Sequence, residues 1–122
     1  VLIAMYGATV GEFGIISKEM TCNQAICALL PNNKVPYTYL FMLAKNVKQE
    51  LTNMAVGSAQ QNISQVLIKG LKIAFNEETC LRYHSIVEPI FKKKKVNDDE
   101  SQRLATLRDT LLPKLMSGEI EV

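Results

Sequence analysis

The sequence predicts an α+β fold: a small mixed α/β head, with strands and one amphipathic helix, followed by a long C-terminal helix of the coiled-coil type. Two observations predict it. Short β-prone runs separated by turns fill the first third, whereas residues 77–116 contain no glycine and repeat apolar residues at helical steps. With 122 residues, 48% of them hydrophobic, the chain can form one packed core but not two. We therefore expect a head at residues 1–76 and an arm at 77–122.

Three candidate strands begin the head. Residues 1–6 and 13–17 flank a turn that contains two glycines, which predicts a hairpin, and residues 24–30 supply a third strand. Val1 opens an apolar, β-prone run with no initiator methionine. We therefore expect further residues to precede it in the intact protein, because an unpaired strand edge would otherwise be exposed.

An amphipathic helix is predicted from Tyr37 to about Met54, because its apolar residues recur at steps of three and four. These positions are Leu40, Leu43, Ala44, Val47, Leu51 and Met54. A polar loop follows, and Ser64 is placed to cap a short helix that runs to about Lys69. Apolar residues then alternate over 71–75, as in a half-buried strand.

The arm is predicted to be helical to about Met116, and a continuous helix of that size would span ~60 Å. Its apolar seam has the three- and four-residue steps of a coiled coil and consists of Leu104, Leu107, Leu111 and Leu115. Pro89 is expected to kink or divide the helix, the polar stretch 92–99 is a candidate break, and Gly118 supplies an end cap. The seam packs either on its own head or on another helix, and the length of the helix favours a partner.

The residue inventory argues against an enzyme. Three cysteines and a single histidine, His84, offer no metal-ligand set, since Cys80 and His84 alone do not make a zinc site. No phosphate-binding loop, dinucleotide-binding glycine pattern or nucleophile elbow is present, so we expect no metal and no cofactor in this chain. An odd cysteine count without a signal peptide, and no apolar run of ~20 residues, predict a cytoplasmic protein and no membrane span. The net charge of +2 is too small to predict nucleic-acid binding.

Four segments, in order and at similar spacing, resemble the specificity subunits of type I restriction-modification enzymes. They are LIAMYGATVGEFGI (2–15), NQAICAL (23–29), GSAQQNIS (57–64) with the short helix and LKI segment after it, and LRDTLLPKLMSGEI (107–120). Each motif alone is common, but together they cover nearly the whole chain. The resemblance extends over the last two-thirds of one family repeat, so the N-terminal part of the target-recognition domain is expected to be missing.

The resemblance implies a non-catalytic subunit that gives DNA sequence specificity. In this family the target-recognition domains read the halves of a split sequence in double-stranded DNA, and their long helices pair antiparallel and dock the methyltransferase subunits. S-adenosylmethionine and catalysis belong to those methyltransferase subunits, and the restriction subunits are partners only indirectly. We also expect self-association, as a homodimer, through the C-terminal helix.

Two loops carry the candidate DNA-binding residues. Hydroxyl and amide side chains suited to phosphates or base edges lie at Ser58, Gln60, Gln61 and Asn62. Tyr6 and Thr9 border the first glycine turn, whose small residues allow close approach of a phosphate. Each loop also has a purely structural interpretation. The amides of the first loop would form hydrogen bonds within the loop's own turns, and the second loop would be a plain hairpin turn. Four successive lysines, 92–95, point round the whole helix and so favour a solvated arm over a flat DNA-binding patch.

A second hypothesis is a truncated half-subunit that acts mainly as a helix-mediated dimerisation and interaction module. Both hypotheses keep the arm and its docking role. Site-specific methylation by a reconstituted complex separates them, because only the first requires the head to read DNA.

Overall fold

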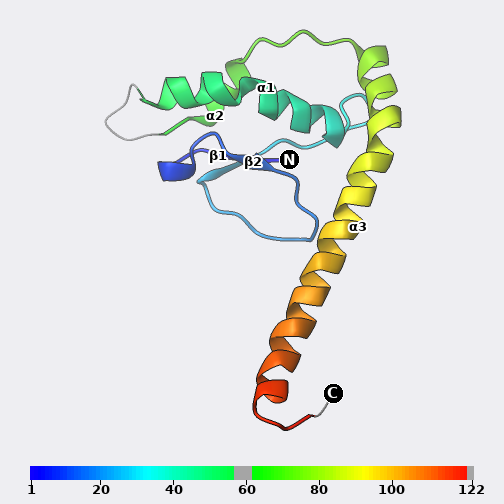
Figure 1. The fold of residues 1–122 in the computed structure, drawn as a ribbon. Coiled ribbons are helices and arrows are strands. Elements are labelled where there is room, and N and C mark those ends of the chain that lie inside the picture. Colours follow the sequence, from blue (N-terminus) through cyan, green and yellow to red (C-terminus); the bar gives the residue numbers. More distant parts are fainter. Residues whose placement is uncertain (57–61, 121–122) are drawn as a thin grey trace. The chain divides into compact units, whose positions relative to one another are not determined.

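The computed structural model describes residues 1–56 and 62–120, which divide into two units, Val1–Val87 and Glu88–Val122. Each unit is described by itself. The first holds the strands and shorter helices as well as the first turns of the long helix, and the second holds the rest of that helix (Figure 1). The predicted α+β class is confirmed. Among the described helices, none is both long and apolar enough to cross a membrane.

A three-stranded antiparallel sheet forms the base of the first unit. Its strands are β1 (Leu2–Ala4), β2 (Phe13–Gly14) and β3 (Ile26–Ala28), in the order β2-β1-β3. Ile3 lies opposite Phe13 on one side and Cys27 on the other. The predicted hairpin and third strand are therefore confirmed, although each strand is shorter than its apolar run.

The hairpin turn is compact because it contains a short 3₁₀ helix, η1 (Gly7–Thr9). Gly7 and Gly11 border the turn with φ of +73° and +81°, a left-handed conformation that glycine adopts without the steric cost of a Cβ. At Gly11 a Cβ would lie 2.7 Å from Oγ1 of Thr52. The turn therefore approaches the neighbouring helix closely, and glycine makes that approach possible.

Helix α1 (Tyr37–Val56) packs its apolar face against the sheet (Figure 1). The buried core shared by strands, turn and helix comprises Val1, Ile3, Val10, Leu40, Ala44, Leu51, Ala55 and Ile63. The predicted helix is confirmed, but the prediction of Met54 on its apolar face is wrong: Met54 is 43% exposed, whereas Ala55 is fully buried. The two side chains lie about 100° apart around the helix, and the smaller one faces the core at the point of closest approach.

Helix α2 (Gln65–Gly70) begins where the sequence predicts, because the Ser64 hydroxyl accepts a hydrogen bond from the Leu67 amide at 3.2 Å. The strand predicted over 71–75 is wrong, because this segment joins none of the described strands. It is held instead by α1: the Tyr39 hydroxyl donates to the Ala74 carbonyl at 3.1 Å, and the Tyr39 and Phe75 rings meet edge-on.

Helix α3 (Glu77–Met116) is a single helix of 40 residues. The predictions that Pro89 divides it and that residues 92–99 break it are therefore wrong. The polar stretch stays helical because its charges pair one turn apart, Lys94 with Asp98 and Lys95 with Asp99. Beyond the last turn, Gly118 adopts a φ of +74° and its amide donates to the Leu115 carbonyl, which confirms the predicted end cap.

Candidate nucleic-acid interface

The glycine turn and the end of the amide-rich loop lie side by side in the first unit. Tyr6 and Asn62, 56 positions apart in the sequence, form an antiparallel β-bridge. Next to it, the Ile63 amide donates to the Met5 carbonyl at 2.8 Å. The structure thus brings together two segments that the sequence offers only as separate candidates.

The bridge is anchored in the core from both sides. Ile63 is fully buried and Met5 is 2% exposed, whereas their neighbours Asn62 and Tyr6 face solvent. Alternation of buried and exposed side chains along paired extended segments produces this arrangement. Tyr6, 44% exposed, and Asn62 are therefore held at the surface by a rigid support.

Three backbone amides at the end of the turn are used in hydrogen bonds within the hairpin. The amides of Val10, Gly11 and Glu12 donate to the carbonyls of Gly7, Ala4 and Thr9 at 2.9–3.1 Å. These three amides therefore have no free hydrogen for a phosphate. The turn also presents two polar side chains on exposed residues, the phenol of Tyr6 and the hydroxyl of Thr9.

Three of the six candidate residues, Ser58, Gln60 and Gln61, lie outside the described residues. Of the other amides that face solvent, Asn23 accepts the Ala25 amide at 3.0 Å through its own side chain, which marks it as a turn-forming residue. Asn62 is the described residue through which the amide-rich loop meets the turn.

Lys69 of α2 contributes positive charge near the sheet. Burial raises the pKa of the Cys27 thiol in β3, and the Lys69 ammonium, close enough to act on that thiol, opposes the shift. Lys69 makes no salt bridge with any other residue in the described ranges, in contrast to Lys48, which pairs with Glu12 at 2.7 Å. The described surface of this unit therefore offers one lysine on α2 that is not neutralised by a carboxylate.

Comparison with known proteins decides the family. Residues 1–75 match the family model described as "Type I restriction modification DNA specificity domain". The chain belongs to this DNA specificity family. It is also 31% identical over 117 residues to the type I restriction enzyme HindI specificity subunit of Haemophilus influenzae, an alignment that covers 93% of this chain and 26% of that protein. The chain thus spans about a quarter of the length of that relative, and no solved structure matches it significantly.

The first unit contains a contact that sequence reasoning missed. Thr38 of α1 is fully buried, and its Oγ1 lies 3.0 Å from Nδ1 of His84, with which it shares a hydrogen bond. The Tyr37 ring meets the His84 ring edge-on at 5.7 Å. His84 therefore ties the first turns of α3 to the start of α1. A buried threonine at a helix start and a lone histidine 46 residues later carry no local signal of this pairing.

The cysteines of the first unit differ in exposure. Cys80 is 2% exposed, while Cys22 faces solvent. Among residues 1–56 and 62–120, no group of three potential metal ligands comes together. His84 contacts Thr38 and Tyr37, which belong to another helix.

The predicted seam of the arm is open in the second unit. Its four leucines, Leu104, Leu107, Leu111 and Leu115, expose between 37% and 50% of their surface. Ile90, two residues after the start of this unit, is 65% exposed. Apolar side chains are therefore exposed at regular helical spacing along the described part of this unit.

Proposed function

We propose that this chain is part of the DNA-recognition and assembly apparatus of a type I restriction-modification enzyme. Residues 1–76 act as part of a target-recognition domain, and residues 77–122 act as the arm that pairs with a helix and docks the methyltransferase subunits. The chain itself is non-catalytic. S-adenosylmethionine is bound by the methyltransferase subunit, and the restriction subunit joins through it.

The bridge between Tyr6 and Asn62 is the observation that carries the DNA-binding proposal. It joins the exposed residues Tyr6 and Asn62 from two segments above a buried support, and Thr9 is exposed in the turn that follows Tyr6. Ser58, Gln60 and Gln61, on the same loop as Asn62, complete the proposed contact set. We assign these neutral hydroxyl and amide groups to positioning the protein on phosphates, since such groups donate to phosphate oxygens regardless of sequence.

The test is DNA methylation and binding by a complex reconstituted with type I methyltransferase subunits. We expect Gln60→Ala combined with Asn62→Ala to weaken DNA binding about tenfold or more, similarly for target and non-target DNA. Asn46→Ala, an exposed amide in α1, is the matched control and leaves binding unchanged. Loss of discrimination at one base pair would instead assign the amides to base reading. Unchanged affinity for both DNAs would refute the proposed contacts.

The open seam supports self-association and, as a second candidate function, an interaction module. Exposed leucines at coiled-coil steps suit pairing with an antiparallel helix of a second copy. Sedimentation across a concentration series tests this pairing, and a monomer at high concentration would refute it. If the chain assembles with methyltransferase subunits but directs no site-specific methylation, the interaction module is its function.

A further inference from the structure

The open face of α3 in the second unit contains a polar segment as well as leucines. Residues at alternating steps of three and four form one stripe: Ile90, Lys93, Asn97, Glu100, Leu104 and Leu107. Ile90, Leu104 and Leu107 are 65%, 50% and 46% exposed. These are the a and d positions of a heptad repeat, with Ile90, Asn97 and Leu104 at a. Three consecutive core positions are therefore polar, with apolar positions on either side.

The other charges of this segment are paired away from the stripe. Lys92 pairs with Glu88 at 3.1 Å, and Lys94 and Lys95 pair with Asp98 and Asp99 one turn along. These intrahelical pairs stabilise the outer face of the helix without a partner. Lys93 and Glu100 are thus the charged residues that the heptad places on the inner face.

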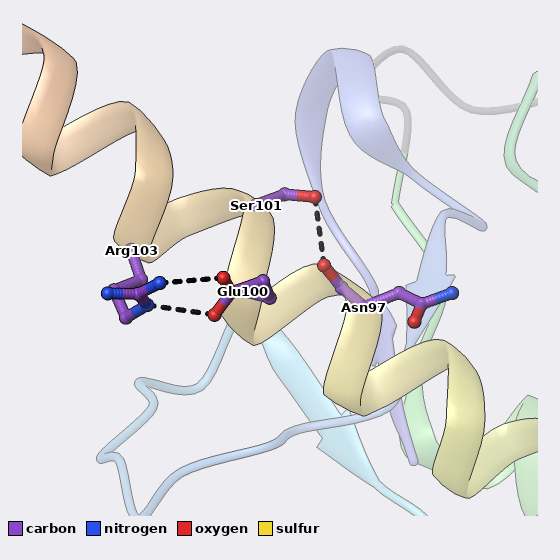
Figure 2. Close-up of polar contacts among 4 residues, drawn as sticks. All are labelled: Asn97, Glu100, Ser101 and Arg103. Carbon is purple, nitrogen blue, oxygen red and sulfur yellow. Dashed lines mark hydrogen bonds and ion pairs between the residues drawn. The ribbon is translucent and has the colours of Figure 1, made fainter.

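Figure 2 shows the polar segment itself. Arg103 holds the Glu100 carboxylate with two hydrogen bonds of 2.7 and 2.8 Å, and this lowers the pKa of Glu100, so the carboxyl is ionised at neutral pH. The Ser101 hydroxyl donates to the backbone carbonyl of Asn97, at 2.8 Å, and the Asn97 amide group points away from it. A partner helix on this face would therefore contact the Lys93 ammonium, the Asn97 amide and the Glu100 carboxylate in succession.

A parallel, in-register second copy is opposed by these charges. It would set Lys93 against Lys93 of the second copy, and Glu100 against Glu100 of the second copy, in two core layers of the same pair. Like charges facing each other across an interface are strongly unfavourable. A staggered parallel pair escapes this clash but is not two-fold symmetric, and so does not close as a dimer.

We propose that two copies of the chain pair antiparallel in one register, with Asn97 of each opposite Glu100 of the other. The inference rests on the self-association proposed above and adds its register. Ile90 then packs on Leu107 of the second copy, and Lys93 lies over Leu104 of the second copy. In this register no charged residue faces a residue of the same charge. The Asn97 amide can donate to the Glu100 carboxylate of the second copy, and the aliphatic stem of Lys93 covers Leu104 of the second copy.

Other antiparallel registers match less well. A shift of one heptad in one direction sets Ile90 against Glu100 of the second copy. A shift in the other direction sets Leu104 against Glu100 of the second copy, and Asn97 against Leu107 of the second copy. Each shift buries the Glu100 carboxylate against an apolar side chain of the second copy, which removes water from the carboxylate and offers it no hydrogen-bond donor in return. The polar segment therefore selects the register, as a buried asparagine does in coiled coils.

Cysteine cross-linking in the full chain, in a Cys22→Ser background that removes the exposed thiol, tests the register directly. Two variants, Ile90→Cys and Leu107→Cys, are mixed at equal concentration, oxidised mildly, and mapped by mass spectrometry. We expect mixed 90–107 disulfides to outnumber 90–90 and 107–107 disulfides by about tenfold. Predominance of like-with-like disulfides, or a chain that stays monomeric at high concentration, would overturn the proposal.

The role of the polar segment has its own matched pair of variants. Asn97→Leu replaces an amide on the stripe, and Gln102→Leu makes the same change on the outer face. We expect the first to tighten the dimer while mixed and like disulfides become comparable, because the apolar stripe then tolerates several registers. Gln102→Leu keeps the wild-type disulfide pattern. An unchanged pattern in Asn97→Leu would overturn the claim that this residue selects the register.

These outcomes are independent of the DNA-binding proposal. Disulfide mapping reports only on the arm, whereas site-specific methylation reports on the head within the assembled enzyme. A dimer in another register refutes this inference and leaves the proposed function in place. If the expected 90–107 disulfides form but the assembled enzyme directs no site-specific methylation, the register stands and the proposed DNA recognition is refuted.

Discussion

Gly11→Ala is expected to destabilise the specificity domain more than the same change at Gly7, although both glycines have positive φ. At Gly7, with φ of +73°, an added Cβ meets nothing within 4 Å. The cost there is conformational, roughly 1–2 kcal/mol for an L-residue in the left-handed region, offset by roughly 0.4–1 kcal/mol from the stiffer unfolded chain. We therefore expect Gly7→Ala to lower the free energy of unfolding by about 1 kcal/mol.

At Gly11 a second cost is added, because the new methyl would lie 2.7 Å from Oγ1 of Thr52. That hydroxyl donates to the Lys48 carbonyl at 2.9 Å, so it cannot turn aside without losing its hydrogen bond. Overpacking of this kind costs roughly 1–3 kcal/mol. The total expected for Gly11→Ala is about 2–4 kcal/mol.

Urea denaturation of the chain, followed by circular dichroism, measures both values. The steric part should be relieved in the double variant Gly11→Ala with Thr52→Ala, whose cost should fall toward that of Gly7→Ala plus Thr52→Ala. Equal costs for the two glycine variants would refute the close approach of the turn to α1. A Thr52→Ala change that adds to Gly11→Ala without any coupling would refute the identified contact.

Three further outcomes follow from burial and helix geometry. Ile63→Ala should cost about 2–4 kcal/mol in urea denaturation, because the side chain is fully buried, whereas Val66→Ala, 78% exposed, should cost under about 0.5 kcal/mol; similar costs would contradict the core assignment. In alkylation at pH 8, Cys27 should react roughly tenfold or more slowly than exposed Cys22, since burial raises the Cys27 pKa and so lowers its thiolate fraction; equal rates would refute this. Pro89→Ala should stabilise α3 by up to ~3 kcal/mol in thermal melts followed by circular dichroism, because proline lacks the helical amide donor; an unchanged melt would show that position 89 lies outside regular helix.

Features encoded by near neighbours were predictable from the sequence. The cap at Ser64, the glycine end of α3 and the helical extent of α1 each depend on residues within a few positions of one another. The predicted breaks in α3 were wrong, because helix-breaking and helix-stabilising residues occur together in that segment. Pro89 and the charged stretch predicted breaks, but one missing amide bond is outweighed by the surrounding turns, and the charges pair along the helix.

The sequence by itself determined which residue types are available for DNA contact and which face of α3 is apolar. Only the tertiary structure decided that Tyr6 lies beside Asn62, that Ala55 rather than Met54 enters the core, and that His84 contacts Thr38. The physical reason is that these pairings follow from how the sheet and helices share one core. Residues tens of positions apart meet because burying the apolar face of each element leaves few arrangements, and no pattern within a short window records which one is adopted.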